Sequence, residues 1–151
     1  MIYAQDAKKV PLFSSSYTNG AVTTANFDRL NFDYATVDIL LGAVSATNLP
    51  PTAISLQESD TTAATSFTNI PGGSSQLITT ANFTAMYPAS SLTTGYQMVT
   101  AQVDCRNRKR YIQLTVTPAT TQVVAALATL TRAKSAVAAD ADSGCTVRVI
   151  G

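Results

Sequence analysis

Residues 34–44, YATVDILLGAV, are the stretch of this sequence that decides the fold. Every second position belongs to one apolar set, formed by Ala35, Val37, Ile39 and Leu41. The positions between them carry Tyr34, Thr36, Asp38 and Leu40. Successive side chains of a β-strand point to opposite faces, so this pattern predicts a strand with one buried face. The apolar set therefore belongs to a core.

The segments on either side repeat this pattern. Pro50-Pro51 excludes a helix, and in residues 53–58 (AISLQE) Ile54 and Leu56 again alternate with polar residues. Residues 67–70, which end at Pro71-Gly72-Gly73, predict a hairpin that returns along this strand. Further strands are expected at residues 96–103 and at 111–117 (YIQLTVT). The predicted core is Val37, Ile39, Leu41, Ile54, Leu56, Ile112, Leu114 and Val116.

Two regions are less regular. Residues 10–17 and 21–25 flank Asn19-Gly20, which predicts an opening hairpin or an arm. Residues 121–139 suit either a helical stripe or a long strand, and we expect a strand at residues 122–132 because the surrounding elements are strands. Residues 74–94 predict a long loop. The total is roughly eight strands without βαβ alternation, so the fold class is all-β, an antiparallel β-sandwich or jelly roll.

The chain has the size of one domain, expected over residues 1–151 with extended arms at 1–20 and 135–151. Charged residues are only 13%, against about 25% in ordinary proteins, and the formal net charge is +1. A surface with so few charges is weakly hydrated, which suits either a Thr-rich neutral surface or one covered by neighbours in an assembly.

Neither a signal peptide nor an apolar run of membrane-spanning length is recognisable, so no membrane partner is expected. Cys105 and Cys145 are expected as free thiols in a reducing cytoplasm, and a single late disulfide is the alternative.

Histidine is absent, which removes the commonest general base and most catalytic zinc sites. The carboxylates show no metal-binding spacing, and we expect them to be solvated turn residues: Asp28, Asp33, Asp38, Glu58, Asp60 and Asp104. The glycine-rich residues 71–75 lack the lysine of a phosphate-binding loop. We therefore expect no catalytic, metal-binding or cofactor-binding residues, and no enzyme.

One charge cluster stands out in the segment DCRNRKRY: Arg106, Arg108, Lys109 and Arg110 hold four of the ten basic residues. A nucleic-acid site needs a wider basic patch with exposed aromatic residues, so nucleic acid is not an expected partner. The remaining readings are a solvated loop between two strands and a docking contact with an acidic protein surface. Interface candidates are Arg106, Arg108 and Lys109, with Lys8 and Lys9 in the N-terminal arm.

Four segments, in order, resemble a family of small phage and prophage virion proteins encoded among head genes. They are AISLQESD at 53–60, FTNIPG at 67–72, RKRYIQL at 108–114 and VTPATTQVVAALATLTR at 116–132, and with the sequence between them they cover about half of the chain. The family pattern is "LQESDD…W…VPG" followed by "GGKRYVRL" and a closing strand. Here Phe67 replaces its tryptophan, and Asn107 and Arg108 replace its glycines.

The resemblance implies a capsid decoration (cement) protein on the virion surface. Such a protein, often a trimer, binds the outside of the major capsid protein lattice and stabilises the shell by bridging capsomers. A tail or head-tail connector component is one alternative. A carbohydrate-binding jelly roll is another, although a composition with 7% aromatic residues and no Trp argues against it.

Overall fold

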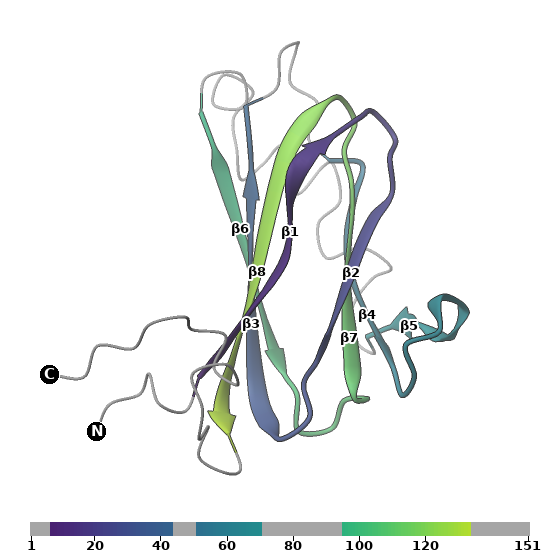
Figure 1. Cartoon of the computed structure of the whole chain (residues 1–151), viewed down its shortest axis with the longest axis vertical. Coiled ribbons are helices and arrows are strands. Elements are labelled where there is room, and N and C mark those ends of the chain that lie inside the picture. Colours follow the sequence, from purple (N-terminus) through teal and green to yellow (C-terminus); the bar gives the residue numbers. More distant parts are fainter. Residues whose placement is uncertain (1–6, 44–50, 71–94, 134–151) are drawn as a thin grey trace, which may run out of the picture.

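The structure is a computed structural model that describes residues 7–43, 51–70 and 95–133. In this part of the chain, eight strands form two antiparallel sheets of four strands each. The sheets pack face to face as a sandwich, with the strands running along its long axis (Figure 1). The all-β fold expected from the sequence is confirmed.

Each sheet combines strands from distant parts of the sequence. The first sheet has the order β1 (Lys8–Tyr17), β8 (Gln122–Ala133), β3 (Phe32–Leu41) and β6 (Gln97–Asp104). The second sheet has the order β2 (Thr23–Asp28), β7 (Tyr111–Thr117), β4 (Ala53–Ser59) and β5 (Thr68–Asn69). A short 3₁₀ helix, η2 (Ala64–Ser66), lies between β4 and β5.

The pairing scheme identifies the sandwich as a jelly roll. Strand β1 pairs with β8, β2 with β7, β3 with β6 and β4 with β5, all antiparallel. This is the scheme of one long hairpin of four strand pairs rolled into two sheets, and the contacts β3–β8 and β4–β7 complete the sheets. Eight strands in such an arrangement define the jelly roll among the sandwich folds.

The predicted core is confirmed. Its eight members are exposed by 6% or less, and six of them are fully buried. They come from β3 in one sheet and from β4 and β7 in the other, so the two apolar strand faces meet between the sheets. Burying such aliphatic side chains contributes roughly 1.5–3 kcal/mol each, which makes this interface the main source of stability.

The ambiguous segment is a strand, as expected: β8 runs from Gln122 to Ala133. It is central in its sheet, paired with β1 on one side and β3 on the other. Its inward residues are Val124, Ala126, Ala128 and Leu130, all buried. The burial of every second residue is typical of a strand, and a helix could not form the backbone hydrogen bonds to both β1 and β3.

Two expectations for the N-terminal segment are wrong. No arm exists over Lys8–Tyr17, because these residues form an edge strand paired with β8. No hairpin joins β1 to β2, because the two strands belong to different sheets. The expected turn does occur: Gly20 has a φ of +72°, and its N–H donates to the Pro118 carbonyl at 2.8 Å. The turn carries the chain from one sheet to the other.

The hairpin of β4 and β5 is confirmed, with Gln57 opposite Asn69 and Glu58 opposite Thr68. It is shorter than expected, since β5 has only two residues. The loop expected at 74–94 and the arm at 135–151 lie outside the described residues, as does Cys145.

Candidate protein-binding surface

The basic loop between β6 and β7 is held by carboxylates of its own chain. Arg106 makes a forked contact with Asp104, with its Nε donating to Oδ1 at 2.9 Å and to Oδ2 at 3.2 Å. The hydrogen bonds from Arg106 lower the pKa of Asp104 to about 2. Both side chains are about half exposed, so this pair fixes local geometry more than it stabilises the fold.

Glu58 anchors the centre of the same loop. Its Oε2 accepts the backbone N–H of Lys109 at 3.2 Å, and its Oε1 lies 3.9 Å from a guanidinium nitrogen of Arg108. The Glu58 residue is only 5% exposed, so the expectation that it is a solvated turn residue is wrong. It lies in the same strand phase as Ile54 and Leu56, which turns its side chain inward at the end of the core.

Arg110 closes the loop onto β2. Its guanidinium donates to Oδ2 of Asp28 at 2.6 and 3.0 Å, and it lies 5.0 Å from the centre of the Tyr111 ring. Burial would raise the pKa of Asp28, but the hydrogen bonds from Arg110 and from the backbone N–H of Leu30 outweigh it and lower that pKa. Three arginines of the loop therefore have carboxylate partners within the chain, and the loop does not present four free positive charges.

Of the other candidates, Lys8 is half-buried and opposite Leu130, whereas Lys9 is exposed and opposite Thr129. The structure thus places both lysines on the edge strand of the first sheet and not on an arm. A docking role for Lys8, Lys9, Arg106, Arg108 and Lys109 stays a prediction.

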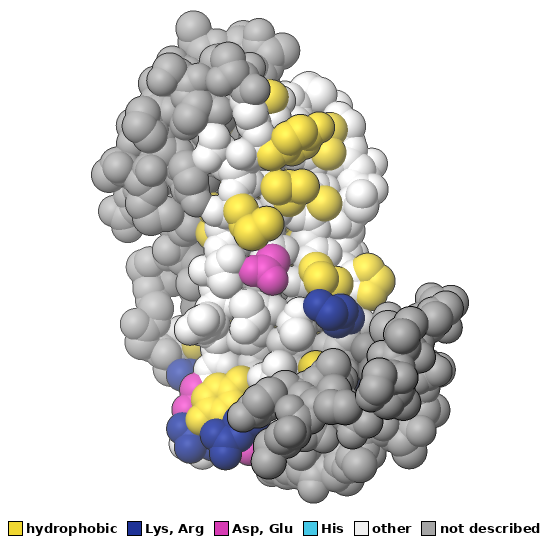
Figure 2. Space-filling model, turned by 90° about the vertical axis from the view of Figure 1, so that its left-hand side faces the viewer, with side chains coloured by type: hydrophobic (Ala, Val, Ile, Leu, Met, Phe, Trp, Pro, Cys, Tyr) yellow, Lys and Arg dark blue, Asp and Glu magenta, His cyan; other side chains and the backbone are white. Residues whose placement is uncertain are grey.

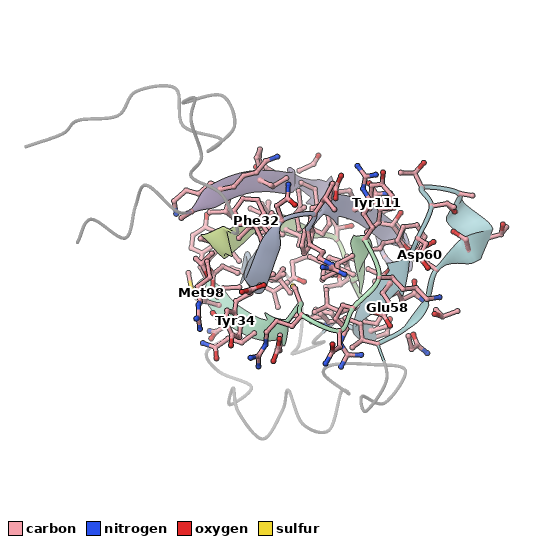
Figure 3. All side chains as sticks on the ribbon, turned by 90° about the horizontal axis from the view of Figure 1, so that it is seen from below. Phe32, Tyr34, Glu58, Asp60, Met98 and Tyr111 are labelled. Carbon is pink, nitrogen blue, oxygen red and sulfur yellow. The ribbon has the colours of Figure 1, made fainter. Side chains whose placement is uncertain are left out.

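Sequence reasoning missed a cluster on the first sheet. The guanidinium groups of Arg106 and Arg132 each lie 5.3 Å from the centre of the Tyr34 ring. Tyr34 is opposite Asp104 on β6 and Thr131 on β8, so Arg106 approaches it from the loop that follows β6 and Arg132 approaches it from β8. Figure 3 shows Tyr34 on one sheet and Glu58 on the other at this end of the molecule. The separation of Arg106 and Arg132 in sequence hid the cluster.

These contacts belong to a strong segregation of charge. All eight Lys and Arg residues of the described segments lie toward the end of the sandwich where β3 and β7 begin and β6 and β8 end. Five of the six described acidic residues lie toward the same end, and the sixth, Asp38, is midway along β3. We call this the charged end. It is the lower end in Figure 1.

The opposite end carries no charged residue among the described segments, and we call it the uncharged end. Three large apolar or aromatic side chains are exposed there: Val22 by 67%, Tyr96 by 68% and Val123 by 46%. Val22 and Tyr96 directly precede β2 and β6, and Val123 is the second residue of β8; all three strands start at this end. Figure 2 shows hydrophobic side chains over the upper and middle part of this side of the molecule, and a further hydrophobic patch among the basic side chains at the lower left.

Apolar residues are also exposed on the outer face of the first sheet, between the uncharged end and the charged end. Register places Ser14, Ala125, Leu40 and Met98 in one row across the four strands, and Pro11, Leu127, Asp38 and Thr100 in the next. Between these rows the β1 register shifts at Pro11 to Phe13, and a groove of about 540 Å³ opens there. Leu40 and Met98 are 37% and 56% exposed.

The described residues include no cluster of three or more His, Cys, Asp or Glu side chains suited to a metal ion. No helix within them is long and apolar enough to cross a membrane. Cys105 is fully buried, and burial raises the pKa of its thiol to about 11.

Comparison with known proteins adds little to this description. No protein-family model and no curated protein sequence matches the chain. Among solved structures, a 4-O-methyl-alpha-glucuronidase of family GH115, BtGH115A, described as specific for decorated arabinogalactans, is similar with a TM-score of 0.36 and 13% identity. The match covers 84% of this chain and 16% of that enzyme's chain. A likeness of this degree carries no argument about function.

Proposed function

We propose that this protein is a non-enzymatic structural protein of a phage virion, a decoration protein that packs its uncharged end against the outer surface of the shell. The observation that carries the proposal is the segregation of charge along the sandwich. Exposed Val22, Tyr96 and Val123 stand at an end without described charges, whereas the ion pairs gather at the other end.

Physical reasoning favours the uncharged end over the basic loop as the shell contact. Burying apolar surface yields about 25 cal/mol per Å², and the core of a protein interface is depleted of charge and rich in aromatic side chains. The arginines of the basic loop already have partners in Asp104, Glu58 and Asp28. Transferring them to a partner would break those contacts, which reduces the net gain.

In this proposal the partner is the major capsid protein, copies of the chain assemble as a trimer, and the protein resides on the capsid surface. Contacts of roughly 1,200–2,000 Å² are ordinary for stable complexes, and several linked copies would strengthen attachment through avidity. A jelly roll is compatible with this role, since viral capsid proteins and lectins both use it, but the fold alone does not specify a function.

The test uses shells that lack this protein and purified chain added back to them. Val22→Asp combined with Tyr96→Asp should abolish binding, because each places a charge in the proposed contact. Leu30→Asp is the matched control: Leu30 is 49% exposed at the charged end, so this variant should bind like the parent. Circular dichroism melting would verify that each variant folds.

Two results would overturn the proposal. One is unchanged binding of the double Asp variant, and the other is a reconstruction that places the chain in a ring at the tail or head-tail junction. Replacing Arg106, Arg108 and Lys109 with Ser tests the loop separately. A loss of occupancy in that variant, with a flatter salt dependence, would assign the shell contact to the basic loop.

A further inference from the structure

The groove on the outer face of the first sheet is a second surface, distinct from the uncharged end. The groove lies beside the register shift of β1 between Pro11 and Phe13. Its walls are formed mainly by Pro11, Leu40, Met98 and Leu127. Exposed apolar surface of this kind marks a candidate binding site for another protein segment.

Asp38 gives the groove its specificity. It is the one charged residue lining the groove. Its Oδ1 accepts a hydrogen bond from the Thr100 hydroxyl at 2.7 Å. Among the described residues it has no Lys or Arg partner. A complementary occupant is an apolar segment with one positive charge.

The chain itself carries a segment of this composition. Residues 146–150 read TVRVI, with Arg148 as their single charge between β-branched residues. In an extended segment Thr146, Arg148 and Ile150 would share one face, and residues two apart are spaced by about 7 Å. Asp38 and Leu40 are also two apart on β3 and point outward. When Arg148 is paired with Asp38, either Ile150 or Thr146 therefore lies next to Leu40.

The position at which the described chain leaves the sheet allows this contact. β8 ends at Ala133, six residues beyond Leu127 and so about 20 Å from the groove. Arg132 has a φ of +56°, so the backbone departs from the extended path of β8 there. The twelve residues 134–145 can span up to about 40 Å, which is enough to reach an adjacent molecule.

We propose that the groove binds residues 146–150 of a neighbouring copy of this chain, with Arg148 paired to Asp38 and the branched side chains against Leu40, Met98 and Leu127. Exchange of such a segment adds contact area between copies without altering either jelly roll. The proposal concerns contacts between copies and does not depend on attachment to a shell.

Sedimentation velocity of the full chain over a range of concentrations tests it. The parent should associate, and Asp38→Lys and Arg148→Glu should each weaken association by about tenfold or more. The charge-exchanged variant, Asp38→Arg with Arg148→Asp, should restore it. Asp60→Lys and Lys134→Glu are matched controls that change the same charges elsewhere in the chain and should associate like the parent.

A second measurement assigns the segment directly. A fluorescent peptide of residues 144–151, with Cys145→Ser, should bind the Arg148→Glu chain and should not bind a chain that also carries Asp38→Lys. Failure of the charge exchange to restore association would overturn the pairing. A parent chain that stays monomeric at every concentration while the peptide binds would overturn exchange between copies, because the segment would then occupy the groove of its own molecule.

Discussion

Truncation of Leu114 tests the arrangement of the core most directly. Leu114 is fully buried on β7, the strand that lies between β2 and β4, and it is opposite Ala25 on one side and Leu56 on the other. Leu→Ala changes at buried sites cost about 2–5 kcal/mol, more where the surroundings cannot collapse into the space. Because backbone pairing holds both neighbouring strands in place, we expect Leu114→Ala to cost about 3–5 kcal/mol.

For a chain of this size, each kcal/mol lowers the melting temperature by about 2–4 °C, so the expected decrease is roughly 6–20 °C. Urea unfolding followed by circular dichroism would give the free energy of unfolding. Leu30→Ala is the matched control, since Leu30 is 49% exposed in the turn between β2 and β3 and should cost about 1 kcal/mol or less. Equal losses in both variants, or an unchanged parent-like stability of Leu114→Ala, would refute the assigned strand phase.

Three further predictions concern single polar groups. Among the described residues, the buried Thr115 hydroxyl has no hydrogen-bond partner. Thr115→Val should therefore raise the free energy of unfolding by about 1 kcal/mol in urea titrations, and a decrease would show that the hydroxyl has a partner. Burial raises the pKa of the Cys105 thiol from 9.0 to about 11. In a Cys145→Ser background this thiol should therefore react slowly with a disulfide reagent at pH 8. The contribution of the raised pKa to the free energy of unfolding is present below pH 9 and lost toward pH 11. The hydrogen bonds from Arg106 lower the pKa of Asp104 from 3.8 to about 2. Their favourable contribution to stability is therefore present above about pH 4 and lost toward pH 2. Arg106→Gln should return the pKa of Asp104 toward 3.8 in a carboxyl NMR titration, and an unchanged pKa would contradict the pairing.

Most strands could be predicted because alternation of apolar residues is a local signal. The core phases of β3, β4 and β7 were correct at every predicted position, and β8 was correctly assigned from its context. In β4 the spacing of two also indicates that residue 58 points inward, although the residue at this position is a glutamate. Glu58 follows Ile54 and Leu56 at a spacing of two, but a carboxylate is usually exposed, and only its contacts with Lys109 and Arg108 explain its burial.

The candidate surfaces were less predictable. Arg106, Arg108 and Arg110 form a conspicuous cluster in the sequence, yet their partners Asp104, Glu58 and Asp28 lie on three different strands. The segregation of charge could not be read from the sequence, because basic residues from positions 8 to 132 converge at one end only after the strands pair. The groove required both the β1 bulge and the outward rows of four strands.

The sequence by itself determined the all-β class, the inward faces of β3, β4 and β7 and the absence of histidine side chains, because these depend on residue type and on a local period of two. Only the tertiary structure decided that β1 is an edge strand beside β8, that the sandwich is a jelly roll, and which carboxylate neutralises each arginine of the loop. Those features depend on pairings between residues up to about 120 positions apart, as for Lys8 and Leu130. Backbone hydrogen bonds give such pairings almost no signature in composition or periodicity, because every residue supplies the same donor and acceptor.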